Sequence, residues 1–297
     1  MKTKIIKLLY SSKGEYISGQ KLSDKIDITR AGIWKHINIL RKEGYIIEAC
    51  SRKGYKLIEA PDTLTSEEVS TFLVTNKIGR NIIHYDTINS TNLMAKAKAS
   101  LGEEEGTVIV SEEQTSGKGR MGRSWSSTKY KDIILSIILR PEIDPIHASK
   151  VTLIGAAAVL KALQEIGIPP QIKWPNDLIL NNKKVCGILT EMSSELNKIH
   201  YLIIGIGINV NSDISDFKSE LINSATSLKI ETNKSVHRKS LMAGVLNNFE
   251  ILYNELLVTH KIKSSVSICR EHSTLLGKDI RIINNNKEQL AKAIELD

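Results

Sequence analysis

Four short apolar runs follow one another in the middle of the chain with only turn sequences between them, and this spacing constrains the fold more than any other feature. The runs lie at 171–174, 178–180, 185–193 and 200–211. Strands that succeed one another without an intervening helix pair mostly antiparallel, because a parallel pair needs a long crossover. Earlier runs at 82–85, 107–112 and 133–140 alternate with helical patterns at 91–100 and 148–166. We therefore predict an α+β domain with a mixed, mostly antiparallel sheet.

The first sixty residues have a different pattern, that of a winged helix-turn-helix. Apolar residues recur at helical spacing, and Ser18 and Thr29 stand where helix N-caps are expected. The expected helices and strands cover, in order, 3–10, 18–26, 29–43, 45–50 and 55–58. Three short helices followed by a hairpin with a basic, glycine-containing tip predict a winged helix-turn-helix domain.

Positive charge is concentrated in this first segment. The whole chain has a formal net charge of +8, and residues 1–60 contain 13 Lys and Arg against 6 Asp and Glu, which gives +7. Such an asymmetry favours DNA as the partner of this segment, and a protein-interaction module is the alternative. The side chains expected at DNA are Ser18, Thr29, Arg30, Lys35, His36, Asn38, Arg52 and Lys53.

Linker and turn sequences divide the chain into three parts. A short linker precedes residues 65–68, whose Thr-Ser-Glu-Glu sequence has capping-box chemistry and predicts a helix over 66–75. A second amphipathic helix is expected over 236–257, and a hairpin near the C-terminus has too few strands to form a stable sheet domain alone. The expected domains are therefore 1–62, 63–272 and 273–297.

Composition excludes several classes of protein. Hydrophobic residues are 41% and charged residues 25%, which are ordinary values for a globular chain. The longest apolar runs, 133–139 and 202–210, are shorter than the roughly 18 residues that a membrane span requires. The three cysteines form no CxxC motif or Cys/His cluster, so neither a disulfide framework nor a protein metal site is predicted. We expect a cytoplasmic protein with no membrane partner.

A glycine-rich loop over residues 117–122 is the first chemical signal. Its sequence fits GxGxxG, but the residues after it are polar and lack the helical periodicity that a dinucleotide-binding turn requires. Three glycines together with Lys118, Arg120 and Arg123 instead favour an anion-binding loop. A solvated basic turn is the alternative.

Three further motifs are each weak when taken alone. The sequence Lys-Trp-Pro-Asn-Asp at 173–177 is followed by Lys184 and Gly187, and both features also occur in ordinary turns. Ser-Thr-Asn at 90–92 opens a helix, where it also suits an N-cap. Gly-Ile-Gly-Ile-Asn-Val-Asn at 205–211 places two glycines in a strand, which often marks the close approach of a ligand or another backbone.

Taken together and in this order, SGxGRxGRxW, KWPNDL, KVCGIL and GIGINVN resemble the motifs of the biotin–protein ligases. With the N-terminal domain, the chain is similar to the bifunctional type, which is both a ligase and a repressor of biotin genes. The resemblance implies that biotin and ATP, with Mg²⁺, give biotinyl-5′-adenylate. Biotin then passes to a lysine of the biotin carboxyl carrier domain of acetyl-CoA carboxylase. It also implies operator DNA as a partner, a homodimer that forms when the adenylate binds, and an SH3-like C-terminal domain, for which 273–297 is too short.

The same resemblance assigns roles to individual residues. The family's catalytic positions correspond to Lys184, Arg120 and Asp177, where Asp177 either orients the acceptor lysine or helps to hold Mg²⁺. The positions that hold biotin or nucleotide correspond to Ser90, Thr91, Asn92, Gln114, Lys118, Gly119, Arg120, Trp125, Lys184 and Asn209.

Two departures from the family pattern leave alternatives open. Lys118 and Met121 stand at positions where the family loop commonly has arginine, and Met121 removes a charge at a position linked to dimerisation. The rival functions are a lipoate–protein ligase of the same fold and a ligand-sensing transcription factor without ligase activity.

Overall fold

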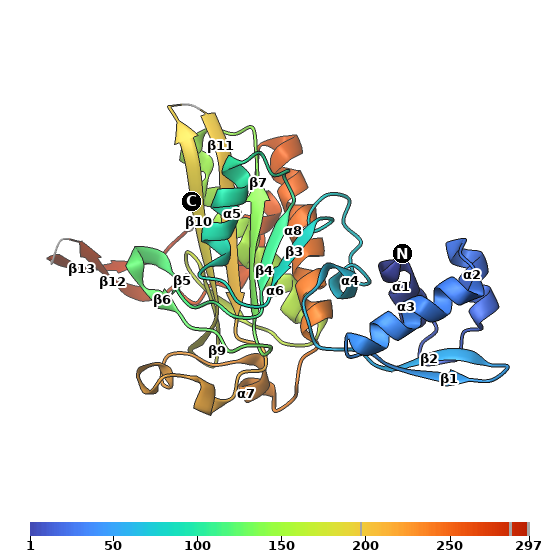
Figure 1. The fold of residues 1–297 in the computed structure, drawn as a ribbon. Coiled ribbons are helices and arrows are strands. Elements are labelled where there is room, and N and C mark those ends of the chain that lie inside the picture. Colours follow the sequence, from blue (N-terminus) through green and yellow to red (C-terminus); the bar gives the residue numbers. More distant parts are fainter. Residues whose placement is uncertain (197, 285–286, 296–297) are drawn as a thin grey trace.

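The computed structural model describes residues 1–196, 198–284 and 287–295. In Figure 1 the N-terminal domain lies at one end of the molecule, a large sheet with helices forms the middle, and the C-terminal hairpin projects from the opposite end. The α+β class predicted from the apolar runs is confirmed.

The N-terminal domain is a winged helix-turn-helix, as its sequence predicts. Its elements are α1 (Lys2–Ser11), α2 (Gly19–Ile26), α3 (Arg30–Lys42), β1 (Ile46–Cys50) and β2 (Gly54–Glu59). Ser18 and Thr29 cap α2 and α3, since their side chains accept hydrogen bonds from the amides of Lys21 and Gly32. We call the hairpin of β1 and β2 the wing. Apolar side chains from the three helices and the wing form a core that is separate from that of the central domain.

The central domain is built on one seven-stranded sheet in the order β3-β4-β7-β11-β10-β9-β8. Only β3 and β4 pair in parallel, and every other neighbouring pair is antiparallel. The strands are β3 (Ile82–Tyr85), β4 (Val108–Ser111), β7 (Ile133–Leu139), β8 (Gln171–Lys173), β9 (Asp177–Leu180), β10 (Lys183–Glu195) and β11 (Lys198–Ile208). The four runs between 171 and 211 therefore form the predicted antiparallel succession.

Helices cover both faces of this sheet. α6 (Ser149–Glu165) and α8 (Arg238–Thr259) pack on one face, and α5 (Thr91–Ser100) covers the other through Ala95 and Ala99. Strand β7 is buried along its whole length because it has a helix on each side. Helix α5 thus lies over the middle strands β7 and β11 (Figure 1).

The helix α6 is unusually apolar. Within the 21 residues of Pro145–Glu165, a window of 18 residues has a mean hydropathy of 1.4, which is long and apolar enough to cross a membrane, and 67% of that window is buried within the fold. Its alanines at 156–158 allow it to lie close to both the sheet and α8. This burial is that of a core helix, which a count of uninterrupted apolar residues does not detect.

Several elements differ from the sequence-based predictions. Helix α4 covers only Ser66–Val69 rather than 66–75, and its N-cap Thr65 makes no side-chain capping bond. Two short helices, α7 (Leu228–Thr232) and α9 (Lys263–Glu271), were not predicted. The C-terminal hairpin consists of β12 (Asp279–Asn284) and β13 (Lys287–Lys292), which pair with each other. The predicted C-terminal hairpin is therefore present, and residues 296–297 lie outside the described part.

The capping box failed because Glu68 has other partners. Its fully buried carboxylate accepts hydrogen bonds from the hydroxyl groups of Tyr10, at 2.9 Å, and Tyr45, and it pairs with the ammonium of Lys239 from α8. Lys239 also donates to the carbonyl of Pro61 at 2.8 Å. We call Tyr10, Tyr45, Glu68 and Lys239 the interdomain cluster, because it ties the N-terminal domain to the central one.

Beside this cluster, Arg238 is fully buried and forms a second polar network. Its guanidinium bonds Glu112 at 2.8 Å and Asp62 at 3.0 Å. Burial raises the pKa of Glu112, but hydrogen bonding from His84, the charge of Arg238 and the amide of Leu64 outweigh it, so the pKa lies below its ordinary value. The folded state therefore holds Glu112 ionised.

This lowered pKa predicts an acid-dependent loss of stability. A carboxyl whose folded pKa is depressed stabilises the fold above its unfolded pKa of about 4.5, and the contribution is lost as the pH falls through the folded value. Replacing Glu112→Gln should lower the free energy of unfolding at pH 7 and flatten its decline between about pH 5 and pH 3. Urea unfolding of both proteins at pH 7, 5 and 3 checks this prediction. If the free energy of unfolding falls equally with pH in the two proteins, the prediction is contradicted.

Candidate functional site

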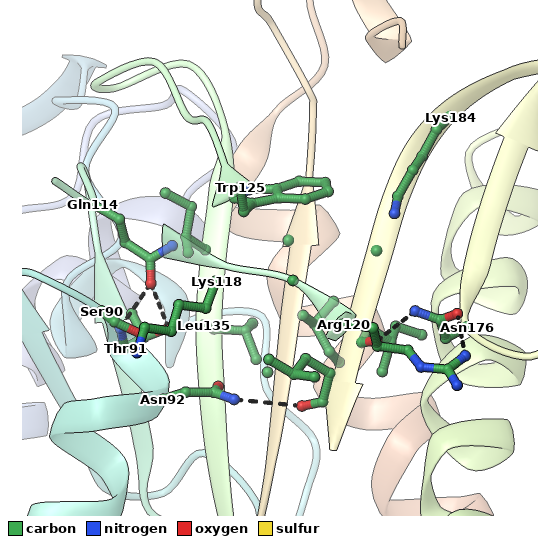
Figure 2. A pocket seen from close by; sticks show the side chains of 18 residues that line it. Ser90, Thr91, Asn92, Gln114, Lys118, Arg120, Trp125, Leu135, Asn176 and Lys184 are labelled. Atoms are coloured by element: carbon green, nitrogen blue, oxygen red, sulfur yellow. Dashed lines mark hydrogen bonds between the residues drawn. The ribbon is translucent and has the colours of Figure 1, made fainter. Parts of the chain in front are cut away.

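A pocket opens over the middle of the sheet, between the N-terminus of α5, the glycine-rich loop and strands β7, β10 and β11 (Figure 2). Nine of the residues expected to hold ligands lie on its wall: Ser90, Thr91, Asn92, Gln114, Lys118, Gly119, Arg120, Trp125 and Lys184. In Figure 2, Ser90, Thr91, Asn92 and Gln114 gather at one end with Lys118 beside them, and Arg120, Asn176 and Lys184 lie at the other. The pocket thus joins a neutral polar end to a cationic end.

At the neutral end the side chains hold one another in place. Gln114 Oε1 accepts hydrogen bonds from the Thr91 amide at 2.7 Å and the Thr91 hydroxyl at 3.1 Å. The Ser136 hydroxyl lies 2.8 Å from Thr91 Oγ1 and 2.6 Å from Asn92 Oδ1, and Asn92 Nδ2 donates to Glu191 at 2.7 Å. Such a network fixes the orientation of its donors and acceptors before a ligand arrives.

Glycines in the floor of the pocket let these side chains lie flat on the sheet. A Cβ atom on Gly205 would lie 2.2 Å from Asn92 Oδ1, and one on Gly207 would lie 2.6 Å from Trp125 Cε2. Non-bonded atoms do not approach each other this closely, so any side chain at these positions would displace Asn92 or Trp125. This explains the two glycines that the sequence places within a strand.

We therefore expect Gly205→Ala to destabilise the protein by about 1–3 kcal/mol, because the added methyl pushes Asn92 away from Ser136 and Glu191. The matched control is Gly244→Ala in helix α8, where the new Cβ would meet Ala162 Cβ at 3.5 Å, an ordinary contact. The control should be neutral or slightly stabilising. Thermal unfolding of both variants measures the difference, and equal shifts in their midpoints would contradict the steric explanation.

The cationic end is organised around Lys184. Its Nζ lies 2.7 Å from Asp177 Oδ1 and 5.5 Å from the centre of the Trp125 ring. Arg120 Nη1 donates to Asn176 Oδ1 at 3.2 Å, and Asn176 Nδ2 donates to the carbonyl of Ile188 at 2.9 Å. Two cations thus converge from the loop and from β10, which suits an anionic group between them.

The glycine-rich loop is a short hairpin. Strands β5 (Gly117–Lys118) and β6 (Ser124–Trp125) pair, and a turn of 3-10 helix at Arg120–Gly122 joins them. After Gly122 the chain enters strand β6 rather than an α-helix, so the loop does not have the strand–turn–helix form of a dinucleotide-binding turn. Met121 lies at the tip with a φ of 56° and is 91% exposed.

A second, larger groove lies against the same hairpin. It is lined by Lys118–Gly122, by residues 146–153 at the start of α6 and by residues 188–192 of β10. Lys118, Gly119 and Arg120 belong to both hollows. The hairpin therefore separates the pocket from an open face of the molecule.

The structure does not bring every expected residue to the pocket. Asn209 does not line the pocket: it is buried, and its Nδ2 donates to the carbonyl of Thr226 at 2.9 Å. Asp177 reaches the pocket through its ion pair with Lys184 rather than as part of the wall. Sequence reasoning missed Ser136, Asn176 and Glu191, although Asn176 stands within the Lys-Trp-Pro-Asn-Asp motif.

The expected DNA-binding residues divide into two groups. Ser18, Arg30 and Arg52 line a groove between α2, α3 and the wing. The other expected residues, Thr29, Lys35, His36, Asn38 and Lys53, are not among those that line it. The Thr29 hydroxyl is engaged in capping α3, and Lys53 lies 5.6 Å from the centre of the Tyr16 ring. Trp34, which the sequence analysis did not single out, also lines the groove.

No preformed metal centre is visible in the described part of the chain. No group of three or more His, Cys, Asp and Glu side chains is placed to hold an ion there. Asp177 is a carboxylate beside the cationic end, and one carboxylate suits a Mg²⁺ ion that is held mainly by substrate phosphates.

Comparisons with known proteins agree with this arrangement. Residues 85–209 match the biotin/lipoate A/B protein ligase family, and residues 2–56 match an HTH domain. The chain is 39% identical to the bifunctional ligase/repressor BirA of Bacillus subtilis, over 99% of this chain and 90% of that protein. Its identity to the protein of the same name from Escherichia coli is 28%, over 96% of this chain and 86% of that protein. A biotin protein ligase from Aquifex aeolicus, solved with biotin and ATP, superimposes with a TM-score of 0.64 at 29% identity, over 73% of this chain and 88% of that one.

Proposed function

The chain belongs to the biotin–protein ligases of the bifunctional ligase/repressor type, and from that premise we propose that its pocket binds biotin and ATP and joins them. The observation that carries the proposal is the joined pocket, in which an ordered hydroxyl and amide network faces two cations. The hydroxyl and amide network suits a neutral ureido ring, which has hydrogen-bond donors and an acceptor. The cations suit a carboxylate that reacts with a phosphate, because both groups are negatively charged.

In this proposal the neutral end holds the biotin ring. Ser90, Thr91, Asn92 and Gln114 supply hydroxyl and amide groups for the ring's N–H and carbonyl groups, and their mutual bonds keep them oriented. Trp125 lies over the glycine floor and would contact the nucleotide side. The ring thus directs its acid chain toward Lys184.

The reaction proposed at the cationic end has two steps. A biotin carboxylate oxygen attacks the α-phosphorus of ATP, and the bond to the β-phosphate oxygen breaks, which gives biotinyl-5′-adenylate and pyrophosphate. A lysine amine of a carrier domain then attacks the acyl carbon, and AMP leaves with the electron pair. Lys184, Lys118 and Arg120 would stabilise the negative charge that develops in both steps. Asp177 would help to hold a Mg²⁺ ion, and that ion would supply positive charge for the phosphates of ATP.

Asp177 has a further role that its geometry supports. Its ion pair with Lys184 fixes the ammonium beside Trp125, so we propose that it positions this cation in addition to the two roles considered from the sequence.

We further propose that the N-terminal domain binds operator DNA, with biotinyl-adenylate as corepressor. The excess positive charge of that segment and its groove support DNA. We propose the domain limits 1–62, 63–272 and 273–297, since separate apolar cores lie on either side of the first boundary.

We propose that the acceptor of biotin is the carrier domain of acetyl-CoA carboxylase and that the protein is located in the cytoplasm.

Release of pyrophosphate from biotin and ATP tests the ligase proposal. The rival functions predict different results: a lipoate ligase would label a lipoyl carrier domain with lipoate, and a pure sensor would release no pyrophosphate. We expect release with biotin but not with lipoate, followed by labelling of a biotin carrier domain. Binding of biotin without pyrophosphate release would overturn the proposal.

We propose that the ligand-dependent dimer forms through the face that carries the glycine-rich hairpin of β5 and β6. Met121 is exposed there and offers none of the polar contacts that an arginine would give. We expect Met121→Arg to strengthen dimerisation in the presence of biotin and ATP by about 1 kcal/mol, or roughly fivefold in the dissociation constant. Sedimentation with and without the ligands measures this, and equal tightening in both proteins would show that position 121 does not set the coupling.

A further inference from the structure

Trp34 is a large aromatic side chain that the fold leaves on the surface of the N-terminal domain. It is 60% exposed, whereas its helix neighbours Ile33 and Ile37 are fully buried. The core of the domain is complete without it, since Trp34 is neither in that core nor packed against it. An exposed tryptophan on such a small domain indicates a binding surface.

The surroundings of Trp34 identify the kind of partner. It lines the groove together with Arg30 and Ala31 of α3, Ser18 and Gln20 at the start of α2, and Arg52 of the wing. None of the described residues that line the groove is acidic. A groove with two arginines and an apolar centre suits a polyanion that also presents apolar groups, which describes the major groove of DNA.

The position of Trp34 along α3 fits direct contact with base edges. The N-terminal half of a recognition helix reads the bases, and Trp34 follows Arg30 by one turn and Ala31 by slightly less. Asn38, one turn further on, does not line the groove. The thymine methyl is the apolar group that the major groove presents to such side chains.

We propose that Trp34, with Ala31 beside it, reads thymine methyl groups and so sets part of the operator sequence, while Arg30 and Arg52 neutralise phosphates. This inference rests on the proposed DNA-binding function. It assigns sequence specificity to an aromatic side chain and affinity to the cations around it.

The test uses a duplex that the full-length wild-type protein selects from a randomised library in the presence of biotin and ATP. Each dT of that duplex is then replaced by dU, which removes only the C5 methyl group. Wild type should lose roughly fourfold in affinity at one or more positions, the effect expected for one buried methyl. Trp34→Ala should bind the parent duplex more weakly and be indifferent to dU at those positions. Trp34→Phe should keep part of the discrimination.

Lys35→Ala is the matched control, because it changes the next residue of α3, which does not line the groove. It should weaken binding to all duplexes equally and reduce the salt slope by at most about 0.9, while dU sensitivity stays at the wild-type level. The thermal midpoint of Trp34→Ala should match wild type, because Trp34 makes no core contact.

Each outcome has a distinct meaning. If Trp34→Ala keeps the dU sensitivity of wild type, the inference is overturned. If the variant binds DNA normally but changes the sedimentation of the protein, Trp34 is a protein contact and the inference is equally wrong. If wild type enriches no sequence, it is the proposed DNA-binding function that fails.

Discussion

Replacing Lys184 with alanine is expected to slow the release of pyrophosphate from biotin and ATP by about 10²–10³-fold, while biotin affinity changes much less. The ammonium lies at the cationic end of the pocket, 2.7 Å from Asp177, whereas the neutral end has its own hydrogen-bond network. A cation aimed at charge that develops during the reaction contributes mainly in the transition state. Single-turnover pyrophosphate release and calorimetric binding of biotin separate the two effects.

The adjacent lysine provides the matched control. Lys183 precedes Lys184 on the same strand, but its Nζ donates to the carbonyl of Ile222 at 3.1 Å and it does not line the pocket. Lys183→Ala removes the same charge and should leave the rate within about threefold of wild type. Equal losses in both variants would indicate a general effect of charge, and equal losses in rate and biotin affinity for Lys184→Ala would count against its role in the transition state.

Lys239→Met is expected to lower the free energy of unfolding by about 3–5 kcal/mol, the largest stability effect that we predict. Methionine keeps most of the apolar stem but leaves the buried carboxylate of Glu68 without its cation. Because Glu68 also binds the hydroxyl groups of Tyr10 and Tyr45, the loss should affect the attachment of the N-terminal domain. Urea unfolding followed by tryptophan fluorescence measures the change.

Two further variants make this prediction specific. Lys129→Met breaks an exposed ion pair with Asp86 and should cost less than about 1 kcal/mol. The double variant Glu68→Gln with Lys239→Met removes both buried charges and should recover much of the loss. If Lys129→Met were as damaging as Lys239→Met, burial of the pair would not be the cause.

The interdomain cluster also affects the use of a variant that lacks the N-terminal domain. The first 62 residues include Tyr10, the Pro61 carbonyl and Asp62, all of which bond Lys239 or Arg238. Removing this segment would expose two charged side chains that the intact protein buries. Point substitutions in the groove are therefore the cleaner way to separate DNA binding from ligase chemistry.

The helix caps and the antiparallel strands could be predicted from the sequence, because each depends on residues that are close to it in the chain. The caps at Ser18 and Thr29 need only the residues that follow them, and the strands between 171 and 211 need only their turns. The absence of the capping box at α4 could not be predicted, because the Glu68 side chain is bound by Lys239, a residue 171 positions away. A capping motif cannot reveal a partner at that distance.

The sequence motifs contain most of the expected residues that line the pocket, and the fold explains why Asn209 does not line it. Residues such as Thr91 and Lys184 stand in recognisable sequences, and the fold brings them to one pocket. Asn209 also stands in a motif, but its amide satisfies the carbonyl of Thr226. The exposed position of Trp34 could not be predicted, because a tryptophan within a helical pattern resembles a core residue in the sequence and only the folded domain shows its exposure.

The apolar helix α6 has a consequence for how the protein is made. The strands β10 and β11 and the helices α8 and α9, which bury it, all follow it in the chain, so the cover of α6 is incomplete in a growing polypeptide until Glu271 has been added. At about 5–20 residues per second, the ribosome needs roughly 5–20 s for that stretch. During this interval the nascent chain exposes a segment apolar enough to attract other chains, chaperones or a membrane. Translation speed and chaperone supply, rather than the stability of the finished protein, are therefore expected to set the yield in an expression host.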